Sequence, residues 1–168
     1  MSDQIFQNLK EFPILLDESQ CVPHKHEILI CGGYNQRVCY SYHTLKNEYK
    51  LICEYPSDAE LNGHCVVKLV NKDNNNKDSN SITLLSFGGS NFRKRHTLVM
   101  EYVSVWGNVS NELNKYNQWV PFTDEHNLPI IIGKYEGHNY HGARAVIDEV
   151  TIICYLSLII QAILACLI

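Results

Sequence analysis

The sequence predicts an all-β protein built from repeated four-stranded antiparallel units. Two observations carry this prediction. Residues 28–33 (ILICGG) and 84–89 (LLSFGG) are each an apolar, strand-like run that ends in two glycines. Matching residue types also recur on both sides of these runs, and an internal repeat determines the architecture before any single residue does.

The flanking landmarks occur in the same order in both copies. They are a polar residue followed by Cys-Val, then the glycine pair, then a tyrosine, then an asparagine two places before a large aromatic residue. Their positions are 20–22, 32–33, 42 and 47–49 in the first copy and 64–66, 88–89, 102 and 117–119 in the second. Each copy therefore predicts four strands, and residues 142–146 (GARAV) begin a third copy.

We expect nine strands, which should form two four-stranded sheets and the edge of a third. They are expected near residues 20–22, 26–32, 37–43, 48–54, 64–70, 82–88, 97–105, 117–122 and 143–147. The corresponding boundaries are an N-terminal lead-in (1–18), a first repeat (19–63), a second repeat with insertions (64–141), the start of a third (142–147) and a hydrophobic C-terminal segment (148–168).

Insertions explain the unequal spacing of the copies. Gln20 and His64 lie 44 residues apart, a normal length for a four-stranded β-propeller blade, whereas His64 and Arg144 lie 80 residues apart. The excess falls at polar joints, chiefly residues 71–80 (NKDNNNKDSN), which contain no apolar residue. Such a stretch cannot offset the entropy lost on ordering it, and surface loops lengthen at little thermodynamic cost. The predicted strands are therefore left intact.

This pattern resembles the kelch repeat, in which an apolar strand ends in Gly-Gly and is followed by a Tyr and then a Trp. The resemblance covers residues 19–146, with Tyr49 in the place of the Trp in the first copy. It implies a partial β-propeller of four-stranded blades around a central channel, and a protein-binding role through the loops at one face. A closed propeller needs at least four blades. This chain holds two and the start of a third, so self-association could complete the ring.

Eight residues carry the motif, and we interpret all of them as structural. Glycine tolerates positive φ and close backbone approach, so a pair of glycines can turn a strand sharply. Tyr and Trp pack between neighbouring sheets while their polar ends can still find a partner. The eight residues are Gly32, Gly33, Tyr42, Tyr49, Gly88, Gly89, Tyr102 and Trp119. No residue is assigned a catalytic, cofactor-binding or metal-binding role.

Composition limits the partners and the compartment. The 168 residues carry a formal net charge of −4, which argues against nucleic acid as a partner. Seven cysteines show no compact disulfide framework, and the N-terminus does not resemble a signal peptide. The expected compartment is therefore the reducing cytoplasm. Residues 93–96 (RKRH) form a short basic cluster that could contact an acidic partner, although such a run is more often a solvated loop tip.

Candidate chemistry is sparse. Residues 21–26 (CVPHKH) and 138–141 (HNYH) gather soft metal ligands, but no paired C-x-x-C motif accompanies them, so we interpret these histidines as surface residues near turns. No nucleophile elbow, Walker loop or dinucleotide-binding glycine motif occurs. We therefore predict neither an enzyme activity nor a cofactor.

The C-terminal segment departs from the repeat. Residues 151–168 contain no charge, no Gly and no Pro. As a helix they would be about 27 Å long, just short of the roughly 30 Å hydrocarbon core of a bilayer. We expect an apolar helix, which would allow membrane attachment. A pair of buried strands of the third repeat is the alternative, because periodicity cannot separate the two.

The function that the sequence favours is a kelch-like, non-catalytic protein-interaction module that presents blade loops to a protein partner. The first alternative is a membrane-anchored protein in which residues 148–168 are the functional element. A fragment of a copper-oxidase-like propeller is a remote alternative, because the Tyr, His and Cys constellation of such an enzyme cannot be placed in this chain.

Overall fold

The computed structural model describes residues 9–69, 81–88, 95–107, 116–132, 141–147 and 152–155. These residues form ten strands and no helix. The strands are β1 (Gln20–His24), β2 (Glu27–Gly33), β3 (Gln36–His43), β4 (Glu48–Glu54), β5 (Cys65–Leu69), β6 (Ser81–Gly88), β7 (His96–Val103), β8 (Val120–Pro121), β9 (Arg144–Ile147) and β10 (Ile152–Tyr155).

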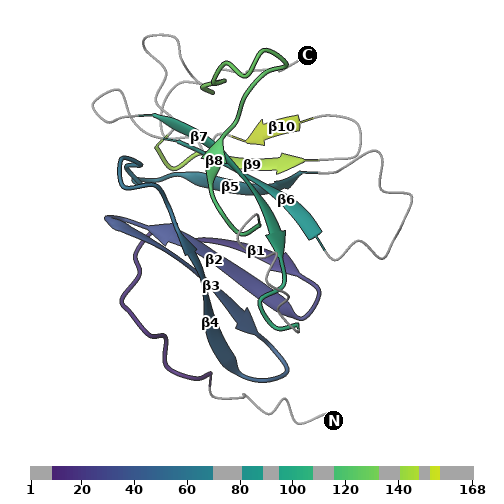
Figure 1. Cartoon of the computed structure of the whole chain (residues 1–168). Coiled ribbons are helices and arrows are strands. Elements are labelled where there is room, and N and C mark those ends of the chain that lie inside the picture. Colours follow the sequence, from purple (N-terminus) through teal and green to yellow (C-terminus); the bar gives the residue numbers. More distant parts are fainter. Residues whose placement is uncertain are drawn as a thin grey trace.

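The strands build two four-stranded antiparallel sheets and one two-stranded sheet. Figure 1 shows the first two with the orders β1-β2-β3-β4 and β5-β6-β7-β8, and the third formed by β9 and β10. The predicted all-β class and the two four-stranded sheets are confirmed. The fourth strand of the second sheet is shorter than predicted: β8 begins at Val120, three residues later than expected, and ends at Pro121, which has no N–H to donate to a ladder. The predicted insertion at 71–80 lies outside the described residues.

Tight turns make consecutive strands of the first sheet antiparallel neighbours. Lys25, Asn35 and Asn47 have φ values of +53°, +56° and +52° in the connections that follow β1, β2 and β3. Among non-glycine residues, asparagine tolerates this left-handed region best, which explains its place in two of these turns.

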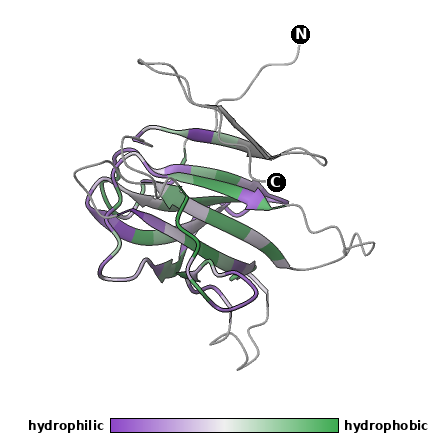
Figure 2. Cartoon of the chain, turned by 90° about the horizontal axis from the view of Figure 1, so that it is seen from above, coloured by the Kyte–Doolittle hydropathy of each residue, from purple (hydrophilic) through white to green (hydrophobic). Residues whose placement is uncertain are grey.

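The sheets stack in layers with β5–β8 in the middle, and Figure 2 shows hydrophobic residues gathered along the strands. The core between β1–β4 and β5–β8 consists of Val22, Leu29, Cys31, Cys39, Tyr55, Leu61, Val66, Ile82, Leu84, Leu98, Met100, Tyr102 and Trp119. The core on the other face of β5–β8 consists of Cys65, Val67, Leu85, Phe87 and Ala143. Because both faces of the middle sheet are covered, β6 is buried on successive residues instead of alternating.

The three sheets approach one another most closely through their first strands. β5 contacts both β1 of the preceding sheet and β9 of the following one. The remaining strands of neighbouring sheets are joined through side chains. The layers therefore converge along the edge formed by β1, β5 and β9.

β10 corrects part of the C-terminal prediction. Ile152–Tyr155 pair with β9 as an antiparallel strand instead of forming the beginning of a helix. β-branched isoleucines favour this extended pairing, so these four residues follow the strand alternative and not the predicted helix. Residues 156–168 lie outside the described part of the chain. Among the described residues, no helix has the length and hydropathy needed to cross a membrane.

Candidate interaction surface

The first glycine pair lets two neighbouring segments approach the end of β2. Gly32 has a φ of +57°, and a Cβ there would lie 2.4 Å from Leu61 Cδ1 in the β4–β5 connection. A Cβ on Gly33 would lie 2.5 Å from the carbonyl oxygen of Asp17 in the lead-in. Only glycine fits both positions without displacing a neighbour, so both residues have a structural role.

The second glycine pair has a comparable environment. Gly88 has a φ of +156°, and a Cβ there would lie 2.7 Å from His64 Cα. His64 immediately precedes β5, just as Asp17 lies shortly before β1. In both copies the missing side chain of a glycine therefore lets the segment before the first strand pack closely against the end of the second strand. Gly89 lies outside the described residues.

The aromatic residues of the fourth strands occupy matching positions. Asn47 and Asn117 have φ values of +52° and +58°, and each donates its backbone N–H to a carbonyl near the end of the third strand. Tyr49 pairs with Tyr42, which pairs with Ile28, four residues before Gly32. Trp119 directly precedes β8, and extending the Val99–Val120 pair by one residue places it opposite Met100 and Leu84, four residues before Gly88. The two aromatic residues are therefore equivalent, two residues after these asparagines. The two rings lie on equivalent faces: Trp119 faces the first sheet, and Tyr49 faces away from the second sheet, toward Phe12 of the lead-in.

The tyrosines matched by sequence lie two residues out of step. Tyr42 pairs with Ile28, four residues before the first glycine of its pair, whereas Tyr102 pairs with Ile82, six residues before its own. A shift of two residues keeps a side chain on the same face of a sheet. Both tyrosines therefore share a face although their registers differ.

The match between residues 20–22 and 64–66 is one residue out of register. Gln20 pairs with Cys31 and Cys65 pairs with Phe87, and both partners directly precede the first glycine of their pair. Cys65, not His64, is therefore equivalent to Gln20. A shift of one residue moves a side chain to the opposite face. Val22 and Val66, which the sequence matched, therefore lie on opposite faces of their sheets and meet in the same core between β1–β4 and β5–β8.

The β1–β4 sheet has an apolar face that points away from β5–β8, which we call the outer face. By strand alternation it consists of Cys21, Pro23, Ile28, Ile30, Val38, Tyr40, Tyr42, Tyr49 and Leu51. Register makes this face equivalent to the β5–β8 face that packs on β1–β4, since Ile28, Tyr42 and Tyr49 correspond to Leu84, Met100 and Trp119.

The lead-in covers part of the outer face. The Phe12 ring lies edge-on to the rings of Tyr40 and Tyr49, with centroid distances of 5.3 and 4.8 Å. The Lys10 backbone N–H donates to Asn47 Oδ1 (2.9 Å). Leu51 is still 55% exposed. Apolar surface therefore stays accessible beside the lead-in.

A buried carboxylate joins the first two sheets near the opposite end from the glycine pair. Glu27 Oε2 accepts hydrogen bonds from the hydroxyls of Ser41 (2.6 Å) and Tyr102, and Oε1 accepts one from Ser104 (2.6 Å). Burial alone would raise the pKa of Glu27, but these hydrogen bonds outweigh it and hold the pKa below its ordinary value. The ionised carboxylate is fully engaged in structure.

A second set of buried polar side chains lies between the same two sheets, at the end where the glycine pairs lie. The Tyr55 hydroxyl donates to Ser86 Oγ (3.1 Å), which hydrogen-bonds His96 Nε2 (3.0 Å). Burial, with a smaller contribution from His64, lowers the pKa of His96 to about 4. A Ser–His pair can serve nucleophilic catalysis. Here Tyr55, Ser86 and His96 are all buried, so the arrangement has no access for a substrate and is structural.

The soft ligands singled out by sequence do not converge. Cys21 is exposed on the outer face and His26 is exposed in the following turn, but His24 is buried toward β5–β8. The interpretation of these histidines as surface residues is therefore wrong for His24, because it lies on the face of β1 that packs against the second sheet. Among the described residues, no group of three His, Cys, Asp or Glu side chains could hold a metal ion. His138 lies outside the described residues. Within the basic cluster at 93–96, His96 is buried and is not part of a loop tip.

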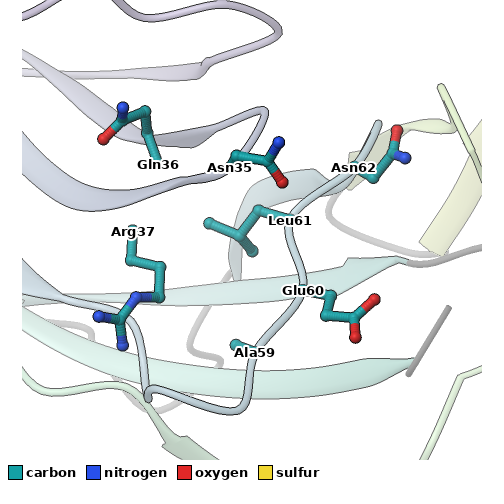
Figure 3. A pocket seen from close by; sticks show the side chains of 7 residues that line it. All are labelled: Asn35, Gln36, Arg37, Ala59, Glu60, Leu61 and Asn62. Carbon is teal, nitrogen blue, oxygen red and sulfur yellow. The ribbon is translucent and has the colours of Figure 1, made fainter.

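A small open pocket of about 180 Å³ lies at the glycine end of the first sheet. Figure 3 shows its lining, which comes from the β2–β3 turn and the β4–β5 connection: Asn35, Gln36, Arg37, Ala59, Glu60, Leu61 and Asn62. Arg37 forms an ion pair of 3.8 Å with Glu54. The lining mixes both charges with amides and one leucine, which specifies no particular ligand.

A cation–aromatic cluster that the sequence analysis did not predict lies at the other end of the sheets. We call it the Trp106 cluster, and it consists of His26, His43, Lys46, Lys50 and Trp106. Lys46 and Lys50 place their Nζ atoms 5.1 and 4.6 Å from the centroid of the Trp106 ring. The His43 ring lies edge-on to Trp106 at 5.0 Å, and His26 stacks on His43 at 6.4 Å. Trp106 stands in a loop outside the repeat pattern, so no periodic signal could have revealed it.

No protein-family model, curated protein or solved structure matches this chain.

Proposed function

We propose that this protein is a kelch-like, non-catalytic protein-interaction module whose sheets are blades of a partial β-propeller. Three features support the proposal: the stacking of sheets face to face, their convergence through first strands, and the matching positions of Tyr49 and Trp119. Propeller blades pack in this way around a common axis.

The observation that carries the proposal is the outer face of β1–β4. Its register equivalent in the second sheet is fully covered by a neighbouring sheet. Large exposed apolar surfaces on soluble domains mark interaction sites. A further sheet of the same kind, from a second copy of the chain, would cover the outer face as β1–β4 covers β5–β8. Such a head-to-tail contact can close into a ring.

The loops at the ends of the sheets would then contact a protein partner. Attachment to a membrane through residues 148–168 stays a prediction, and the strand at Ile152–Tyr155 shortens the segment available for a spanning helix.

Light scattering coupled to size-exclusion chromatography of the whole chain tests the outer face. The parent chain should elute as a complex of at least two copies. Leu51→Glu should shift it to the monomer, because a charge placed on the outer face must be desolvated on docking. Leu45→Glu is the matched control, since Leu45 is also exposed (72%) but lies in the β3–β4 turn. A parent chain that stays monomeric at all concentrations, or equal effects of both variants, would contradict the proposal.

A further inference from the structure

The Trp106 cluster combines side chains from both sheets on one surface. His26 comes from the β1–β2 turn, His43 from β3, Lys46 from the β3–β4 turn and Lys50 from β4. Trp106 comes from the segment after β7 in the second sheet. The lysines and His26 are exposed, and His43 and Trp106 are partly exposed. The cluster is therefore a surface assembled by the packing of the two sheets.

The ring of Trp106 is held in a fixed orientation. Its indole N–H donates to Ser41 Oγ (2.9 Å), and its backbone N–H donates to Ser104 Oγ (3.2 Å). Both serines in turn donate to the buried carboxylate of Glu27. The Lys50 ammonium also donates to the Val105 carbonyl (3.2 Å). A pre-organised tryptophan loses little conformational entropy when a partner binds, and tryptophan is enriched among residues that dominate interface energies.

The charge of the cluster is positive although the whole chain carries a net charge of −4. Among the described residues, neither Lys46 nor Lys50 forms an ion pair with a carboxylate. Glu27 is buried and already accepts three hydrogen bonds. Two exposed acids lie on β4: Glu48, across the ladder from His43, and Glu54, at the far end of the strand, where it pairs with Arg37. Two ammonium groups therefore lie beside one aromatic face without a carboxylate partner among the described residues.

We propose that the Trp106 cluster is the docking site for an acidic segment of a protein partner. The partner's carboxylates would accept hydrogen bonds from Lys46 and Lys50, while its aliphatic stems rest on the Trp106 ring. This inference rests on the proposed function and names the chemistry of its partner. The cluster lies at the end of the sheets opposite the pocket at Asn35 and Leu61, so it also specifies which set of loops binds.

Titration of the ¹⁵N-labelled whole chain with a capped hexaglutamate peptide tests the inference. The chain has two tryptophans, so its two indole N–H resonances report separately on Trp106 and on the buried Trp119. The Trp106 resonance should shift on titration while that of Trp119 stays in place. A capped hexaglutamine peptide should shift neither, and added salt should weaken the hexaglutamate effect because the charges are exposed.

Charge-matched variants separate a specific site from bulk attraction. The double variant Lys46→Gln/Lys50→Gln should weaken hexaglutamate binding by about tenfold or more, as expected when charge complementarity is removed. Arg37→Gln, at the opposite end of β3, should change it by less than about twofold, because its exposed ion pair contributes little. Equal losses in both variants, no shift of the Trp106 resonance, or tighter binding of a single-stranded oligonucleotide than of hexaglutamate would overturn the inference. The self-association proposed above uses the outer face, which does not include these lysines, and it is measured by light scattering without peptide. Failure of this inference and failure of the proposed function are therefore distinguishable.

Discussion

Glu27 shows how one buried residue joins two repeats. Its carboxylate accepts hydrogen bonds from Ser41 in its own sheet and from Tyr102 and Ser104 in the next. Burial together with the bond to Glu27 raises the pKa of Tyr102, so the phenol stays protonated and remains a donor. A buried carboxylate that lacks hydrogen-bond donors is costly, so the loss of any one donor should measurably lower the free energy of unfolding.

The substitution Tyr102→Phe should destabilise the protein by about 1.5–3 kcal/mol, the range for a hydrogen bond to a charged group. The ring and its packing are kept, so the loss reports on the hydroxyl. Tyr49→Phe is the control, because Tyr49 is only partly buried on the outer face, and it should lie within about 0.5 kcal/mol of the parent. Urea denaturation of both variants gives the comparison. Equal midpoints would show that the Glu27–Tyr102 hydrogen bond makes no net contribution to the free energy of unfolding.

His96 should make the protein less stable in mild acid. Its pKa is about 4 in the folded chain, below the ordinary value of 6.5, because burial disfavours the imidazolium. Between these values the unfolded chain binds more protons than the folded one. The stability that His96 contributes is therefore complete above pH 6.5 and is lost as the pH falls toward 4. The loss is at most about 3 kcal/mol. The pKa values of His24 and His64 are lowered as well and act in the same direction.

Denaturation at several pH values between 7 and 4 measures this slope, and NMR titration of the His96 ring locates its source. The ring should stay neutral down to about pH 4 in the folded protein. His96→Gln should flatten the slope while keeping a hydrogen-bonding group near Ser86. A His96 ring that titrates near 6.5 would contradict the prediction even if the variant fails to fold.

At the scale of single elements, the glycine pair determines how β2 ends. Gly33→Val should destabilise the protein by roughly 1–3 kcal/mol, since its Cβ would collide with the backbone at Asp17, which cannot rotate away. Gly107→Val is the matched control, because a Cβ at Gly107 meets nothing within 4 Å. Thermal unfolding of the two variants should differ by several degrees, and coincident curves would remove the structural role assigned to Gly33.

Local patterns predicted the strands well, because each strand and its turn are encoded by neighbouring residues. The apolar runs that end in glycine pairs and the repeated landmarks around them predicted the bounds of β1 to β4 to within a few residues. Register between strands was harder. The Cys-Val identity at 21–22 and 65–66 suggested equivalence, but pairing depends on the facing strand and shifts the match by one residue.

Contacts between sheets were beyond sequence reasoning. Glu27 meets Tyr102 and Ser104 across 75 and 77 residues, and no periodicity specifies such pairs. Trp106 lies in a loop without a repeat equivalent, so the cluster around it appears only after both sheets are packed. His96 was counted with a basic run although its ring is buried, since strand β7 begins at that residue.

At the scale of the whole molecule, the repeat places chemically similar faces in different surroundings. The face of β5–β8 that carries Trp119 is covered by β1–β4, whereas among the described residues the equivalent face that carries Tyr49 is contacted by the lead-in. One chain thus contains a covered and a partly exposed version of the same kind of face. Comparing the two faces shows how far the contribution of an aromatic side chain to stability depends on whether a neighbouring sheet covers it.

Trp119→Ala and Tyr49→Ala should therefore differ widely in the free energy of unfolding of the monomer. Trp119 stacks on Tyr55 at a centroid distance of 4.6 Å and an interplanar angle of 15°, and its indole N–H contacts Cys39 Sγ at 3.4 Å. Removing it opens a cavity between the sheets and should cost about 3–5 kcal/mol. Tyr49→Ala removes contacts with Tyr42 and Phe12 on the outer face and should cost less than half as much.

The same two variants also test self-association. Tyr49→Ala should have the smaller effect on the stability of the monomer but the larger effect on association. Docking of a second copy would bury Tyr49 as Trp119 is already buried, so Tyr49→Ala should weaken self-association in dilution experiments by light scattering. Trp119→Ala, if folded at low temperature, should leave association close to that of the parent. If Tyr49→Ala destabilises the monomer as much as Trp119→Ala, the outer face is already filled within one chain, and no further sheet packs on it.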